Sequence, residues 1–235
     1  MNSPLIIALD VESRQEALAL VRKIGSAASF YKVGLELYSA AGMDLVGELK
    51  AEGLRVFLDL KFYDIGETVK RAVAQIARSG ADFLTIHSHS SVMRAAVEGK
   101  NAHPLALLAV TVLTSFDDND LKDDGYSRGV SELVELRARN AMKAGVNGLI
   151  CSAVEVGRLR SICGPDMILV TPGVRSPGAS SGDQKRIATP AEAIASGASY
   201  LVIGRQVTRS QDPQGEVKKI LDEIAANGIR PPVLA

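Results

Sequence analysis

Eight short apolar segments alternate with eight helix-like segments along this chain of 235 residues, and this alternation limits the possible folds more than any other feature. Strands that are separated by helices run parallel, because each helix returns the chain to the starting edge of the sheet. Eight such units in a chain of this length predict an α/β protein, a closed (β/α)₈ TIM barrel, with an open doubly wound sheet as the alternative. The expected strands are Pro4–Leu9, Phe30–Val33, Val56–Lys61, Phe83–His87, Leu105–Val112, Gly148–Cys151, Met167–Val170 and Tyr200–Ile203.

The helix signals between these strands agree with that interpretation. Capping boxes begin at Ser13 and Thr189, and an Asp212-Pro213 pair opens the last helix. No change of composition marks a linker, so we expect residues 1–235 to form a single catalytic domain. Two long strand-to-helix segments, Ser115–Val130 and Pro172–Ala188, should lie on the catalytic face as loops that can close over a ligand.

One strand carries charges inside an otherwise apolar sequence. In R-V-F-L-D-L-K-F-Y-D, the alternation places Val56, Leu58 and Leu60 on the face that helices should cover. Asp59 and Lys61 then share the other face, and Asp64 follows where the strand should end. An ordinary structural ion pair is the simplest explanation. The position at the carboxyl end of a parallel strand favours a functional one, because barrels build their active sites there.

Polar residues follow the other strands at the same end. They are Asp10, Lys32, His87, Thr114 and the turns Gly173–Arg175 and Gly204-Arg205. In a barrel these residues converge on one mouth. The two glycine–arginine turns follow strands seven and eight, where barrels often bind phosphate through backbone N–H groups and arginine.

The acidic neighbours of Lys61 define its expected chemistry. Opposite charges favour the protonated amine. A protonated lysine is a poor Schiff-base nucleophile, but it can donate a proton to a carbanion and stabilise the developing negative charge.

Composition excludes several other classes of protein. Lysine plus arginine and aspartate plus glutamate both number 27, so the formal net charge of +0 indicates no nucleic-acid or anionic-membrane partner. Apolar runs such as Leu105–Leu113 are too short to span a bilayer, and the first residues do not resemble a signal peptide. The two cysteines and three histidines lack metal-site spacing. We therefore expect a cytoplasmic protein without a metal site.

A family resemblance becomes visible when the motifs are taken together. These motifs are Asp59-x-Lys61-x-x-Asp64, P-L-I-I-A-L-D at 4–10, Y-K-V-G at 31–34, T-P-G-V-R at 171–175, D-Q-K-R at 183–186, T-P at 189–190 and I-G-R at 203–205. With them, over essentially its whole length, the chain resembles bacterial orotidine 5′-phosphate decarboxylases. The family usually has K-F-H-D-I-P-N-T where this chain has K-F-Y-D-I-G-E-T, which leaves Asp64 and Thr68 in place.

The resemblance implies an enzyme without metal or cofactor that converts orotidine 5′-monophosphate to UMP and CO₂ in pyrimidine synthesis. It implies that Lys61 protonates C6 of the pyrimidine and that Asp59 faces the departing carboxylate. It also implies a homodimer with shared active sites, in which Asp64, Ile65 and Thr68 reach into the partner's site. The catalytic residues would be Lys32, Asp59, Lys61 and Asp64, with Asp10 and Lys32 at the ribose, Thr114 near the pyrimidine, Pro172 lining the pocket, and Arg175, Gln184, Gly204 and Arg205 at the phosphate.

Two alternatives remain at this point. Magnesium-dependent decarboxylases or aldolases of sugar phosphates share the D-x-K-x-x-D motif, but that resemblance implies an acidic metal ligand at the end of strand two, where this chain has Lys32. The other alternative is a nucleotide-binding barrel without catalytic activity.

Overall fold

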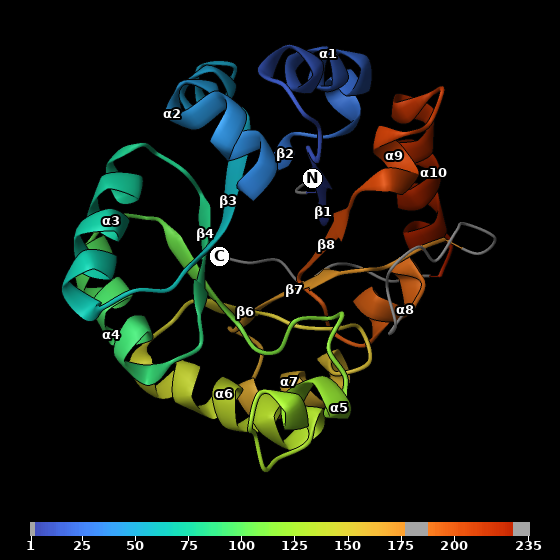
Figure 1. Cartoon of the computed structure of the whole chain (residues 1–235). Helices are drawn as coiled ribbons and strands as arrows, with labels where there is room; N and C mark the ends of the chain where they lie inside the picture. Colours follow the sequence, from blue (N-terminus) through green and yellow to red (C-terminus); the bar gives the residue numbers. More distant parts are fainter. Residues whose placement is uncertain (1–2, 177–187, 228–235) are drawn as a thin grey trace.

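Eight parallel strands form the centre of the molecule and close into a barrel in chain order (Figure 1). The structure is a computed structural model that describes residues 3–176 and 188–227. Strand β1 pairs with both β2 and β8, which closes the ring and confirms the predicted (β/α)₈ fold. The strands are β1 (Leu5–Ala8), β2 (Phe30–Gly34), β3 (Arg55–Phe62), β4 (Phe83–His87), β5 (Ala106–Val110), β6 (Gly148–Ile150), β7 (Ile168–Pro172) and β8 (Tyr200–Ile203).

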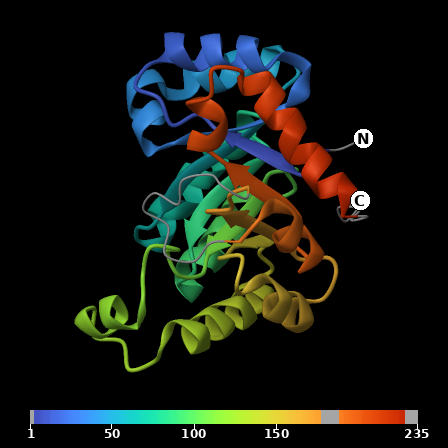
Figure 2. The same ribbon diagram turned by 90° about the vertical axis from the view of Figure 1, so that its right-hand side faces the viewer.

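Helices surround the strands on the outside of the barrel (Figures 1 and 2). In the part of the chain that the structure describes, none of them has the length and apolar character needed to cross a bilayer. The helices are α1 (Arg14–Ile24), α2 (Leu35–Ala51), α3 (Gly66–Arg78), α4 (Ser90–Lys100), α5 (Asp118–Asp123), α6 (Val130–Ala144), α7 (Val156–Cys163), α8 (Pro190–Ala195), α9 (Arg205–Thr208) and α10 (Pro213–Ala226), with a 3₁₀ turn, η1, at Gly25–Ala27.

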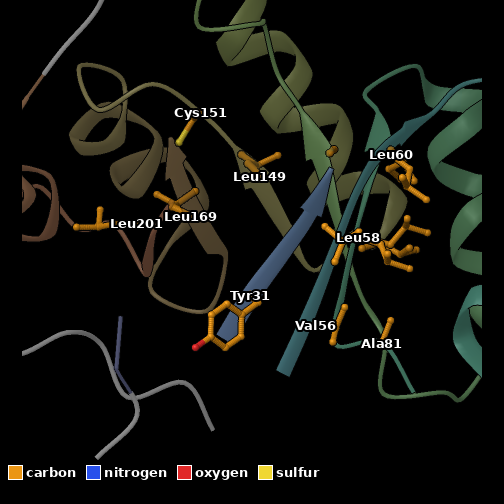
Figure 3. Close-up of a cluster of buried hydrophobic side chains, with 14 of the residues drawn as sticks. Tyr31, Val56, Leu58, Leu60, Ala81, Leu149, Cys151, Leu169 and Leu201 are labelled. Carbon is orange, nitrogen blue, oxygen red and sulfur yellow. The ribbon is translucent and has the colours of Figure 1, made fainter. Parts of the chain in front are cut away.

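The apolar core has two parts because successive strand residues point to opposite faces. The larger part lies between strands and helices and includes Val56, Leu58 and Leu60, as the alternation predicted (Figure 3). The smaller part contains Phe30, Phe57, Phe83 and Tyr200 together with aliphatic side chains from the other strands, and it fills the barrel interior. The interior below the mouth is therefore packed rather than open.

Arg55 lies at the amino end of β3 and contacts the interior aromatic side chains. Its guanidinium lies 3.9 Å from the centre of the Phe30 ring and donates a hydrogen bond of 3.1 Å to the hydroxyl of Tyr200. The same group forms an ion pair of 3.7 Å with Asp82. These contacts link the lower end of the barrel to its aromatic core.

Strand β3 departs from regular pairing where its charged residues lie. Leu58 pairs with Leu84 of β4, but the next pair joins Phe62 to Ile86, so β3 advances by four residues while β4 advances by two. Asp59 and Lys61 lie inside this bulge, which extends β3 one residue beyond its expected end. Bulges redirect side chains and are frequent beside active sites.

The first long segment contains a helix that the sequence analysis did not predict. Asp117 caps the short helix α5, where the capping box with Asp120 satisfies backbone N–H groups, and Leu121 is buried. Helix α2 is kinked at Gly42, where the backbone is not helical. The second long segment lies largely outside the described residues.

Candidate active site

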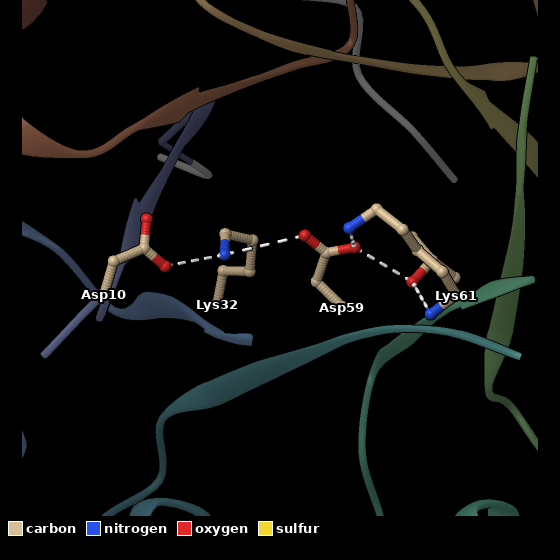
Figure 4. A network of polar contacts seen from close by, with 5 residues as sticks. Asp10, Lys32, Asp59 and Lys61 are labelled. Atoms are coloured by element: carbon tan, nitrogen blue, oxygen red, sulfur yellow. Dashed lines mark hydrogen bonds and ion pairs between the residues drawn. The ribbon is translucent and has the colours of Figure 1, made fainter. Parts of the chain in front are cut away.

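A row of four charged side chains crosses the mouth of the barrel (Figure 4). Lys32 of β2 donates a hydrogen bond of 2.9 Å from Nζ to Asp10 Oδ1, just beyond β1. The same Nζ lies 3.6 Å from Asp59 Oδ2, and Asp59 Oδ1 accepts a hydrogen bond of 2.8 Å from Lys61 Nζ. Three neighbouring strand ends thus bring together an alternating series of two carboxylates and two ammonium groups, which we call the charge row.

Burial makes these charges interact more strongly than a surface pair would. The side chains of Lys32 and Asp59 are only 10% and 17% exposed, whereas that of Asp10 is 54% exposed. Burial alone would raise the pKa of the Asp59 carboxyl. The charges of Lys32 and Lys61 and hydrogen bonds from Lys61 and Thr85 outweigh that effect and hold the pKa of Asp59 below its usual value. Asp59 is therefore a carboxylate at neutral pH.

Lys61 adopts a backbone conformation that lysine rarely has. Its φ of 48° lies in the left-handed region, which costs an ordinary L-residue about 1–2 kcal/mol. In the bulge, the backbone N–H of Lys61 donates to the hydroxyl of Thr85 rather than to a strand carbonyl, at 2.9 Å. Strain of this kind persists only where the surroundings impose it, and it is concentrated at functional sites.

A cavity of about 230 Å³ lies against the charge row. Lys32, Asp59 and Lys61 form its charged wall, and Thr114 and Pro172 line it too. A small, largely apolar chamber with charges on one side can hold a flat polar ring and strengthen electrostatic contacts with it. The cavity residues that the sequence analysis did not select are Phe57, Val110, Val112, Leu113, Ser115, Ile150 and Val202.

Two glycines lie beside the charge row and leave room for its side chains. A side-chain carbon added at Gly34 would lie 3.0 Å from Lys32 Nζ and 3.5 Å from Asp10 Oδ1. A side chain at this position would press on the Lys32 ammonium, which would have to shift by a few tenths of an ångström, whereas the distance to Asp10 is an ordinary contact. Gly204 after β8 also lies close to Asp10, since a side-chain carbon there would be 3.7 Å from Oδ2.

The expected phosphate residues lie around the neighbouring strand ends. Arg175 follows β7, is buried, and donates a hydrogen bond of 2.7 Å to the carbonyl of Val174. Gly204 caps the short helix α9, and Arg205 begins it and is exposed. Gln184 lies outside the described residues. The three that the structure describes, Arg175, Gly204 and Arg205, do not line the cavity.

Asp64, Ile65 and Thr68 lie outside the cavity of their own chain, on the turn into α3 and its first residues. Asp64 is exposed and accepts a hydrogen bond of 2.7 Å from the N–H of Ile65. The preceding Tyr63 contacts His87 and His89, with ring centres 5.0 and 4.8 Å away. Within one chain, Asp64 is therefore separate from the charge row.

Thr85 is the functional candidate that the sequence analysis missed. It is fully buried in β4 and donates a hydrogen bond of 3.0 Å to Asp59 Oδ1. The alternation in F-L-T-I-H could have indicated this residue, because it places Thr85 on the same interior face as Phe83 and His87, in the strand that follows the charged one.

Comparison with known proteins identifies the family. A family model described as orotidine 5′-phosphate decarboxylase / HUMPS family matches residues 3–220. This chain belongs to that family. The orotidine 5′-phosphate decarboxylase / HUMPS assignment confirms the resemblance seen in the motifs.

Relatives in the orotidine 5′-phosphate decarboxylase / HUMPS family match almost the full length of the chain. An orotidine 5′-phosphate decarboxylase of Rhodopseudomonas palustris (strain BisB5) is 53% identical, with 94% of each chain covered. One of Methylobacterium sp. (strain 4-46) is 50% identical, over 94% of this chain and 95% of the other. The crystal structure of orotidine 5′-phosphate decarboxylase from Lactobacillus acidophilus superposes with a TM-score of 0.84 at 35% identity, covering 94% and 98% of the two chains.

Proposed function

We propose that this chain decarboxylates orotidine 5′-monophosphate to UMP and CO₂, the last step of pyrimidine synthesis, without a metal or cofactor. The observation that carries the proposal is the charge row: an ammonium group held 2.8 Å from a carboxylate that is only 17% exposed, at the wall of an apolar cavity. The identity of the substrate is inferred from the names of the relatives. The rest of the proposal assigns a role to each residue.

The reaction places a carbanion where the pyrimidine ring cannot directly delocalise it. The bond between C6 and the carboxylate breaks, CO₂ departs, and the electron pair remains on C6. The ammonium group of Lys61 stabilises this charge and then transfers a proton from Nζ to C6. Since the charge on C6 develops during the reaction, a fixed ammonium binds the transition state more strongly than the substrate.

Asp59 and Lys32 prepare Lys61 for this role. Asp59 fixes the Lys61 ammonium and faces the carboxylate that leaves, while Lys32 offsets the charge of Asp59 on its other side. Asp10 and Lys32 bind the ribose. Thr114 lies near the pyrimidine, Pro172 lines the pocket, and the apolar walls exclude water from the reacting carbon.

Phosphate recognition is assigned to Arg175, Gln184, Gly204 and Arg205. The turns after β7 and β8 are a common phosphate site in barrels of this kind. Arginine offers a planar pair of N–H groups, and glycine lets the backbone approach the anion. Binding energy from this distant group can hold the reacting carbon against the charge row.

The working unit in this proposal is a homodimer with shared active sites. Asp64, Ile65 and Thr68 would complete the site of the partner subunit, and Asp64 would thereby add a third carboxylate to its charge row. The exposure of two large side chains supports this assignment: Tyr63 is 61% exposed and Ile65 is 74% exposed. Burial in a subunit interface would account for both. We also propose a single catalytic domain and a cytoplasmic location.

An assay of orotidine 5′-monophosphate in the presence of a chelator tests the proposed reaction. We expect the absorbance of the substrate to disappear at the same rate with and without EDTA. Loss of activity in EDTA, restored by magnesium, would instead support the metal-dependent alternative. Tight UMP binding without CO₂ release would indicate a barrel that binds nucleotides without catalysis.

A further inference from the structure

Thr85 contacts two residues of the charge row, Asp59 and Lys61, without lining the cavity. Its Oγ accepts a hydrogen bond of 2.9 Å from the backbone N–H of Lys61 and donates one of 3.0 Å to Asp59 Oδ1. The side chain is fully buried in β4, away from solvent and outside the cavity lining. It can therefore affect catalysis only through Asp59 and Lys61.

The chemistry of the two partners defines what residue 85 must offer. A backbone N–H can only donate a hydrogen bond, and an ionised carboxylate can only accept one. A single small group between them must therefore accept from one and donate to the other. A hydroxyl group does both, whereas the isosteric side chain of valine does neither.

The bulge explains why a side chain is needed at this point. Between the pairs Leu58–Leu84 and Phe62–Ile86, strand β4 has only Thr85 opposite the three residues from Asp59 to Lys61. Regular pairing cannot satisfy the backbone here, and the hydroxyl of Thr85 takes the Lys61 N–H. This hydrogen bond is made at the residue whose φ is 48°.

The hydroxyl also orients the carboxylate of Asp59. Oδ1 accepts from both Thr85 Oγ and Lys61 Nζ, which leaves Oδ2 facing Lys32. Rotation of this carboxylate would move the Lys61 ammonium with it. Displacements of about 1 Å at a reacting group can lower a rate by about 10²-fold.

We propose that Thr85 is a positioning residue for the decarboxylation, with its hydroxyl fixing both the backbone of Lys61 and the carboxylate plane of Asp59. The proposal rests on the function assigned above to Lys61. It adds a residue that belongs to neither the cavity wall nor the charge row.

Thr85→Val is the direct test, since it removes the hydroxyl and keeps the shape. We expect kcat to fall by about 10- to 100-fold, with KM and the affinity for UMP changed by less than about threefold, because no proposed substrate contact is lost. Thr85→Ser retains the hydroxyl and should recover most of the lost kcat. Thr111→Val is the matched control: Thr111 is equally buried, but its hydroxyl donates only to the carbonyl of Ile150, at 2.9 Å.

Wild-type kcat in Thr85→Val would overturn the proposal. So would equal losses in Thr85→Ser and Thr85→Val, or an equal loss in Thr111→Val, because the effect would then not come from this hydroxyl. If Thr85→Val does not fold, Thr85→Ser and Thr85→Ala provide the same comparison. Lys61→Ala, measured in parallel, separates the two hypotheses: an active Lys61→Ala variant refutes the role of Lys61, whereas an inactive one beside an active Thr85→Val refutes only the role of Thr85.

Discussion

Lys61 Nζ lies 2.8 Å from Asp59 Oδ1, although one residue alone separates them in β3. In a regular strand, the side chains of residues i and i+2 point to the same face, but their Cα atoms are about 6–7 Å apart. The bulge opposite Thr85 and the left-handed backbone of Lys61 accompany the close contact seen here. The reactive pair is therefore a product of irregular backbone structure as much as of residue type.

Lys61→Ala should abolish turnover while largely preserving nucleotide affinity. Loss of a preorganised charge that acts on the transition state should lower kcat by at least about 10²- to 10³-fold. Steady-state kinetics and UMP binding by calorimetry measure the two effects. Lys50→Ala is a matched control, since Lys50 forms an equally short ion pair, 2.8 Å from Asp82, away from the mouth. Unchanged turnover in Lys61→Ala would refute its role.

Arg205→Ala should mainly weaken binding of the substrate phosphate. A hydrogen bond to a charged group contributes about 1.5–3 kcal/mol, so we expect KM to rise by about 10- to 100-fold. Orotidine, which lacks the phosphate, should react equally well with both proteins. Arg209→Ala removes another exposed arginine at the end of α9 and serves as the control. An effect of Arg205→Ala confined to orotidine would contradict the phosphate assignment.

Mixing two inactive variants tests the shared site. Lys61→Ala and Asp64→Ala chains should each be inactive, but a mixed dimer contains one site with both native residues. Random exchange in a twofold dimer should restore roughly a quarter of wild-type activity. Lys61→Ala mixed with Asp59→Ala is the control, because both residues belong to the same chain's site and no native site can form. Proven subunit exchange without recovery in the first mixture would exclude the shared site.

The charge row should make stability depend on pH through Asp59. The pKa of Asp59 in the folded protein lies below its usual value of 3.8, so its ionised form stabilises the fold. That contribution is complete above the unfolded pKa and is lost as the pH falls through the lower folded value. We expect Asp59→Asn to reduce the free energy of unfolding at about pH 6 by roughly 1–3 kcal/mol.

Urea unfolding between about pH 3 and pH 7 measures this contribution. The stability difference between wild type and Asp59→Asn should be constant near neutral pH and shrink in acid. Asp222→Asn changes an exposed carboxylate on α10 and should have little effect. A difference that grows as the pH falls would have the wrong sign for a depressed pKa.

At the opposite end of the barrel, Arg55→Met should affect stability rather than catalysis. It removes the contact with the Phe30 ring and the hydrogen bond to Tyr200 but retains the apolar stem. We expect the free energy of unfolding to fall by about 1–2 kcal/mol. The kcat of the folded enzyme should stay within about twofold of wild type, because active sites of such barrels lie at the other end. A large loss of kcat with unchanged stability would contradict the assignment of Arg55 to stability rather than to catalysis.

Periodicity was sufficient to predict the barrel, because each strand and helix repeats its apolar pattern at the spacing of its backbone. The charged face of β3 was visible for the same reason. The bulge was not, since alternation assumes regular pairing, and a positive φ at Lys61 contradicts the preference of lysine. Thr85 was missed because one threonine inside F-L-T-I-H resembles an ordinary strand residue. Helix α5 was missed because aspartates that form a capping box also occur in solvated loops.

The bulge in β3 has a consequence for how this scaffold can change. Asp59, Leu60 and Lys61 lie between the paired positions of β3 and β4, so the ladder between these two strands does not depend on regular pairing of the three residues. On the other side of β3, Asp59 pairs with Gly34 of β2 through its backbone, which a change of side chain leaves in place. Replacement of the reactive side chains should leave the ring of strands closed. New chemistry could therefore be introduced at this point, by natural divergence or by a protein engineer, without redesign of the barrel that supports it.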